Sequence, residues 1–108
     1  MVNPKFLCGK HLRGEHYEIH LHRHNFVKHH SITGRVIPVV QIEPESMGTR
    51  HDELAKEMLV RDMNHQSPYE MPDLSYLPDH IRCVRVDLDV SMRDLHERCP
   101  ECKARYFS

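Results

Sequence analysis

The sequence has no tryptophan and few aromatic residues of any kind, which make up 6% of its 108 residues. Apolar residues account for 39% and charged residues for 29%. No apolar run approaches the roughly 18 residues that a membrane-spanning helix needs. The first ten residues also lack the apolar stretch of a secretory signal. These absences argue against membrane association and predict a small cytoplasmic protein whose modest core needs additional stabilisation.

Neither sign of charge dominates the whole chain, because the formal net charge is −1, but the first third differs from the rest. Residues 1–36 carry six Lys and Arg against two Glu, whereas residues 37–108 carry nine basic residues against fourteen acidic ones. A basic first third can meet phosphate groups, and the acidic remainder limits non-specific binding to DNA. A chance fluctuation in a small protein explains the asymmetry equally well.

The apolar spacing predicts a first long helix from about residue 4 to about residue 30. Asn3 and Pro4 are typical of a helix start, with Asn as the N-cap and Pro in the first turn. Beyond them a narrow apolar stripe recurs every seven residues, at Leu12, Ile19 and Phe26.

A second helix is predicted over about 49–63. Thr49 and Asp52 resemble a capping box, and Asn64 is a plausible left-handed stop. Its buried face is expected at Leu54, Ala55, Met58 and Leu59.

The remaining segments predict little regular structure apart from one short helix. Residues 31–48 and the proline-rich residues 64–90 are expected to be loops or extended chain. Ser91 with Asp94 then predicts the cap of a short helix that ends at the "CPEC" turn. The expected fold is therefore mainly α. It is a small single domain over residues 1–108, with two long helices, a short C-terminal helix and a zinc knuckle.

Four cysteines in a cytoplasmic setting indicate metal ligands or free thiols more than disulfides. Cys99 and Cys102 form a C-x2-C pair, and Cys8 with His11 supplies a matching C-x2-H pair. Four such ligands can hold one tetrahedral zinc ion, which would staple the two ends of the chain together. Two alternatives remain: His96 is a ligand instead, or the terminal cysteines are merely a reactive pair.

Three further histidines, His16, His20 and His24, step by four residues along one side of the first helix. Such a row favours a solvated or partner-facing edge over a second metal site. Cys83 is expected to be a buried free thiol.

A continuous polar ridge is predicted on the other flank of the apolar stripe, formed by Cys8, His11, Glu15, Glu18 and His22. Two carboxylates three residues apart, flanked by imidazoles and by basic side chains, can transfer protons or stabilise a developing cation. Spacing alone favours the alternative, a solvated helix edge with ion pairs.

Three segments together carry a resemblance to a known family: "NPKFLCGKHLRGEHYEIH", "RHDELAKEMLVRDMNHQSP" and the terminal "RCPEC". They resemble the pyrimidine dimer DNA glycosylase family, which includes the bacteriophage endonuclease V group and zinc-knuckle relatives. The resemblance implies a mainly helical glycosylase and abasic-site lyase that acts on damaged double-stranded DNA. It also implies the cytoplasm of a bacterial or phage-infected cell.

The resemblance further implies which residues form the site. A main-chain amine at the N-terminus, on Met1 or on Val2 after processing, would attack C1′ of the damaged nucleotide and form a Schiff base. Glu18 matches the assisting carboxylate by motif, with Glu15 beside it, and a structural zinc ion is expected. DNA contacts are expected from Arg13, Tyr17, His22, Arg23, Lys28 and Arg35. The alternative function is a zinc-stapled module that binds nucleic acid or a protein partner without chemistry.

Overall fold

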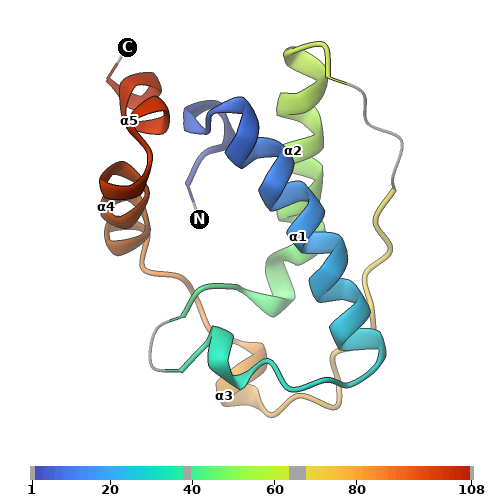
Figure 1. Ribbon diagram of the computed structural model, residues 1–108. Helices are drawn as coiled ribbons and strands as arrows, with labels where there is room; N and C mark the ends of the chain where they lie inside the picture. The colour runs from blue at the N-terminus through green and yellow to red at the C-terminus, as the bar shows by residue number, and fades with distance from the viewer. Residues whose placement is uncertain (1, 38–39, 64–67, 108) are drawn as a thin grey trace.

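The computed structural model describes residues 2–37, 40–63 and 68–107, and Figure 1 shows their arrangement. Every regular element in these ranges is a helix, which confirms the mainly α fold class. In chain order the elements are η1 (Pro4–Phe6), α1 (Gly9–Val27), η2 (Thr33–Arg35), η3 (Pro44–Ser46), α2 (Met47–Val60), α3 (Asp79–Arg82), α4 (Leu88–Arg98) and α5 (Pro100–Tyr106).

The first predicted helix is divided into two, so a helical turn begins at Pro4 as expected but the helix is not continuous to residue 30. Asn3 does cap a helix, but only the single 3-10 turn of η1, where its side chain accepts a hydrogen bond from the Lys5 N–H at 3.1 Å. Leu7 and Cys8 then adopt extended backbone, and α1 begins at Gly9 with Cys8 as its N-cap. The helix ends at Val27, before residue 30, because His29 takes a left-handed conformation with φ 56°.

Helices α1 and α2 pack against each other (Figure 1), and the termini and the chain between the helices complete the core around them. The predicted stripe is confirmed, since Leu12, Ile19 and Phe26 are buried. From α2, Leu54 and Met58 are buried as expected, but Leu59 is 64% exposed. The buried face of α2 runs instead through Met47, Arg50, His51, Leu54 and Met58. Their three- and four-residue spacing turns Leu59 outward.

The start and end of α2 also differ from the prediction. The helix begins at Met47, directly after η3, so Thr49 and Asp52 lie inside it and not at its cap. Near its end the left-handed residue is Asp62, with φ 61°. Asn64, the predicted stop, lies outside the described residues.

The segment predicted as an extended linker contains α3 and the first turn of α4. Asp87, and not Ser91 with Asp94, caps α4, because its Oδ1 accepts a hydrogen bond from the Val90 N–H at 3.1 Å. As predicted, α4 ends at the "CPEC" turn, and Cys99 then caps a further short helix, α5.

Helix α5 packs against η1, so the two ends of the chain lie side by side (Figure 1). Among the described residues no helix combines the length and the apolar character that crossing a membrane requires.

Candidate functional site: a metal-binding cluster beside a polar cleft

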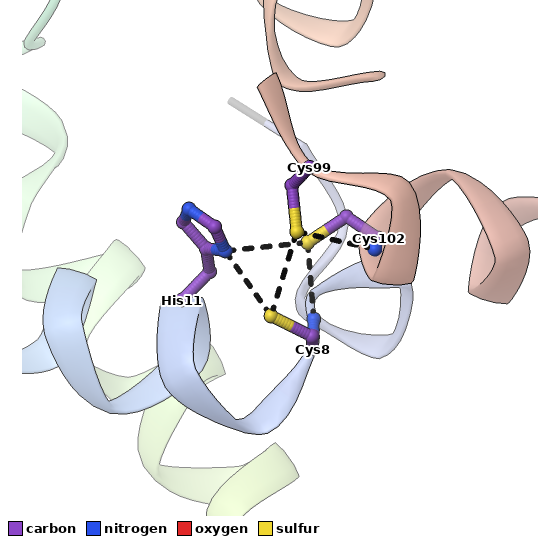
Figure 2. A group of neighbouring side chains, drawn as sticks. All are labelled: Cys8, His11, Cys99 and Cys102. Carbon is purple, nitrogen blue, oxygen red and sulfur yellow. Dashed lines mark hydrogen bonds between the residues drawn. The ribbon is translucent and has the colours of Figure 1, made fainter. Parts of the chain in front are cut away.

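Two turns from opposite ends of the chain bring Cys8, His11, Cys99 and Cys102 together (Figure 2). The Sγ atoms of Cys8 and Cys99 are 3.8 Å apart, and the Cys102 Sγ is 3.6 Å from the His11 Nδ1. Four ligands around one tetrahedral zinc ion, with zinc–sulfur bonds of about 2.3 Å, would stand about 3.8 Å apart sulfur to sulfur. The four side chains therefore form a cluster that could hold a metal ion.

Backbone hydrogen bonds support this cluster. The Cys8 N–H donates to the Cys102 Sγ at 3.2 Å, and the Cys102 N–H donates to the Cys99 Sγ at 3.4 Å. The second of these bonds lowers the pKa of Cys99. Burial raises the pKa of Cys102 to about 12, so this sulfur keeps its proton at neutral pH unless a cation replaces it.

Two other predictions concerned His96 as an alternative ligand and Cys83 as a buried thiol. His96 does not join the cluster, because its ring lies against the rings of Tyr106 and Phe107, with centroids 5.0 and 5.9 Å away. Cys83 is exposed, which corrects the expectation of a buried thiol. It follows the short helix α3, where the chain runs over the surface.

A cleft of about 1120 Å³ lies beside the cluster, between the polar ridge of α1 and the chain from Arg85 to Arg98. Four of the five predicted ridge residues line it: His11, Glu15, Glu18 and His22. A cleft of this size can accept a nucleotide taken out of a duplex. Its charged lining has both signs, from Lys10, Glu15, Glu18, Arg35, Arg85, Asp87, Asp94 and Arg98.

The N-terminal segment reaches into this cleft and is held there by a buried arginine of α2. Arg50, only 3% exposed, donates from Nη1 to the Val2 carbonyl at 2.6 Å and from Nη2 to the Glu15 carboxylate at 3.0 Å. Its Nε makes a second bond to the same carboxylate. Val2 is buried and lines the cleft, whereas Met1 lies outside the described residues. Glu15 is thus engaged by Arg50 in a two-pronged ion pair.

Glu18 lies one helical turn further along the cleft wall and differs from Glu15. It is exposed, and its carboxylate has no hydrogen bond or ion pair with the side chains that the structure describes. His22 follows another turn along, buried to 8% exposure. Burial, reinforced by the positive charge of Arg35 and opposed by Glu18, lowers the pKa of His22. Its ring is therefore neutral at neutral pH.

The residues expected to hold DNA are divided between the cleft and the surface outside it. His22 and Arg35 line the cleft. Arg23 faces away from it, donating from Nε to the Glu70 carbonyl at 2.6 Å. The others, Arg13, Tyr17 and Lys28, are exposed and lie outside the lining.

The row of three predicted surface histidines is broken up as well. His24 is exposed, beside the ring of His30. His16 and His20 are half-buried and turn toward His51 of α2, so the three histidines do not form one solvated or partner-facing edge.

Sequence reasoning missed Arg50 and His51, the two charged or polar residues of α2 that are almost fully buried. A signal was present, because they precede the buried Leu54 by four and three residues and so share its face. The predicted buried face included only apolar residues and so left them out.

Comparison with known proteins identifies the family to which the chain belongs. A family model described as pyrimidine dimer DNA glycosylase matches residues 1–71, which include the N-terminal segment, α1 and α2 but not Cys99 or Cys102. No curated protein and no solved structure matches the chain. Because the family match spans well over half of the sequence, the chain belongs to the pyrimidine dimer DNA glycosylase family, whose substrate is DNA.

Proposed function

We propose that the protein is a DNA glycosylase and abasic-site lyase that works through a Schiff base between the N-terminal amine and C1′ of a damaged nucleotide. One observation carries the proposal. Val2, Glu15 and Glu18 line the same cleft, and Arg50 ties the Val2 carbonyl to the Glu15 carboxylate. Arg50 thereby holds the N-terminal segment at Val2 beside Glu15, one helical turn from Glu18.

The nucleophile is the α-amine of Met1, or of Val2 after removal of Met1. An α-amine has a pKa near 7.7–8.0, so a useful fraction is unprotonated at neutral pH. Its lone pair forms a bond to C1′ while the C1′–N bond to the base breaks and the base leaves with a proton. Opening of the sugar ring gives an iminium ion. Loss of a C2′ proton then breaks the C3′–O bond and cuts the strand by β-elimination.

Glu18 is the carboxylate that assists these steps. Its charge stabilises the cationic states at C1′, and its oxygens can move the protons. The absence of a side-chain partner for Glu18 among the described residues supports this role, because the Glu15 carboxylate is already engaged by Arg50. Glu15 is accordingly a positioning residue that holds the N-terminal segment through Arg50.

The substrate is damaged double-stranded DNA with one nucleotide turned into the cleft. Arg35 lies on the cleft wall close to His22 and supplies positive charge there, and Lys10 and Arg98 add more. The exposed Arg13, Tyr17 and Lys28 extend the contact surface along α1 outside the cleft.

The cluster of Cys8, His11, Cys99 and Cys102 holds a structural zinc ion. Three thiolate ligands and one imidazole suit zinc, and the 3.8 Å sulfur separation fits its bond lengths. When bound, the ion ties the α4–α5 turn to the start of α1, and so fixes the N-terminal segment beside the cleft.

Borohydride trapping on DNA with a single abasic site tests the proposal, because no glycosidic bond has to be broken first. The unmodified protein should form a covalent adduct, and peptide mapping should place it on the N-terminal residue. Acetylation of the α-amine should abolish the adduct.

Lys10 is the matched control, since it brings a second amine to the same cleft. The variant Lys10→Met should still be trapped. An adduct on Lys10 would refute the N-terminal nucleophile. No adduct in the unmodified protein, with DNA binding retained, would leave only the binding-module function.

A further inference from the structure

Three histidines converge at the contact between α1 and α2, on a side of α1 that does not line the cleft. His16 and His20 stand one turn apart on α1, and His51 reaches them from α2. The Nε2 atoms of His16 and His51 are 3.2 Å apart. The ring centroids of His20 lie 4.9 Å from those of His16 and 5.0 Å from those of His51. Each ring offers one nitrogen, and these three nitrogens lie within 4.8 Å of one another.

We propose that His16, His20 and His51 form a second metal site, which binds a divalent transition-metal ion such as Zn²⁺, Co²⁺ or Ni²⁺. Imidazole nitrogens are preferred ligands of these ions. Two nitrogens bound to one tetrahedral zinc ion at about 2.0–2.1 Å stand about 3.3 Å apart. The 3.2 Å between His16 and His51 already matches this spacing. Histidines at positions i and i+4 of a helix are also a recurrent pair of zinc ligands.

The surroundings of His51 favour a metal ion over a simple stack of rings. Its Nδ1 lies 3.1 Å from the Asp52 Oδ1, so the carboxylate accepts the Nδ1–H and leaves the Nε2 lone pair directed at His16. Carboxylate support of this kind orients metal-binding histidines and makes them better ligands.

The ring of Tyr69 encloses the site from another side. It stacks on His51 with centroids 5.3 Å apart and lies 5.9 Å from His20. His51 itself is 2% exposed. Solvent therefore competes little with the ring nitrogens.

This site has a different set of ligands from the cluster of Cys8, His11, Cys99 and Cys102, called the sulfur cluster below. The charge that remains on a bound ion therefore differs as well. Three neutral imidazoles leave the full charge of the ion in place, whereas three thiolates more than neutralise it. With three protein ligands the fourth tetrahedral position falls to water or to an anion. The ion would also join α1 to α2, two helices that pack directly against each other.

Cobalt titration separates the two sites, because only a site with thiolate ligands gives sulfur-to-cobalt charge-transfer absorption. Protein purified with zinc in its sulfur cluster should bind one further Co²⁺ per chain. The bound cobalt should show weak visible d–d bands and no charge-transfer band. Metal analysis after gel filtration should count both ions.

The variants His16→Asn and His20→Asn should each lower the affinity for this second ion at least about tenfold while leaving the zinc in place. Zinc retention and an unchanged circular dichroism spectrum show that each variant is folded. His24→Asn is the matched control, since His24 lies one turn beyond His20 on α1 but outside the cluster. It should bind cobalt like the unmodified protein. Asp52→Asn should weaken binding less than loss of a ligand does.

No cobalt uptake beyond the sulfur cluster would overturn the second site. Uptake that survives both His16→Asn and His20→Asn, or that is lost equally in His24→Asn, would overturn it as well.

Discussion

The two polar sides of α1 have different chemistry although they belong to one helix. The cleft side presents carboxylates at Glu15 and Glu18, and the other side presents the imidazoles of His16 and His20. Each side is completed by one of two consecutive buried residues of α2. Arg50 binds Glu15 at the cleft, and His51 meets His16 on the other side.

The difference shows how neighbouring residues in one helix can serve separate sites. Side chains on consecutive helical residues diverge by about 100°, so two adjacent residues at a helix contact reach past opposite sides of the partner helix. The segment "RHDELA" thereby places a cation beside carboxylates and an imidazole beside imidazoles. Both placements are electrostatically consistent, since a carboxylate pairs with a guanidinium and imidazoles can share a metal ion.

The largest expected effect on stability comes from removing a ligand of the sulfur cluster, which lies at the start of α1. Cys99→Ser should lower the free energy of unfolding by several kcal/mol, because metal binding contributes to folding in a protein with a small core. Denaturant titration with metal analysis measures it. Cys83→Ser is the matched control, since that thiol is exposed, and it should change stability by less than about 0.5 kcal/mol. Equal stability of the two variants would contradict a structural metal.

Arg50→Met tests how much the buried ion pair between Arg50 and Glu15 contributes to stability and to cleavage. It leaves the Val2 carbonyl and the Glu15 carboxylate without their partner, so we expect a loss of about 3 kcal/mol in the free energy of unfolding. Abasic-site cleavage should fall as well, because the N-terminal segment loses its anchor. Arg85→Met removes an exposed ion pair with Glu45 and two hydrogen bonds to the neighbouring Cys83 and Val84 carbonyls, and should cost less than about 1 kcal/mol. Similar losses in both variants would show that Arg50 is no special anchor.

The sequence predicted the sulfur cluster better than either contact with α2. Two x2 spacings specify local ligand pairs, and a metal ion needs four ligands, so Cys8, His11, Cys99 and Cys102 follow from chemistry with little knowledge of the fold. The apolar stripe of α1 was equally predictable, because the seven-residue spacing of its apolar residues alone defines it.

The contacts of Arg50 and His51 could not be predicted from the sequence in the same way. Their spacing from Leu54 puts them on its face, but their partners on α1 depend on how the two helices pack in the folded chain. Sequence spacing accordingly grouped His16 and His20 with His24 along one helix, whereas the histidine that they meet is His51 of α2.

Glu18→Gln compares the two carboxylates of the cleft. The substitution keeps the shape and removes the charge, so cleavage of abasic DNA should fall by a factor of about 10², which corresponds to about 2.7 kcal/mol. Binding to the same DNA should persist. Glu15→Gln should lower cleavage less, and should instead lower stability, because it weakens the pair with Arg50. Cleavage more sensitive to Glu15→Gln than to Glu18→Gln would exchange the two roles.

The smallest expected effect separates two arginines that sequence reasoning treated alike. Arg35 lines the cleft, whereas Arg23 is held by the Glu70 carbonyl at 2.6 Å and by the Glu70 carboxylate at 4.0 Å. Each phosphate contact contributes about one to the slope of log affinity against log salt. Arg35→Gln should therefore reduce the slope by about 1 and weaken binding of duplex DNA by up to about tenfold at low salt. In Arg23→Gln the slope should stay unchanged, because that guanidinium is already engaged within the protein. A slope that falls in Arg23→Gln but not in Arg35→Gln would move the DNA-binding surface from the cleft to the opposite side of α1.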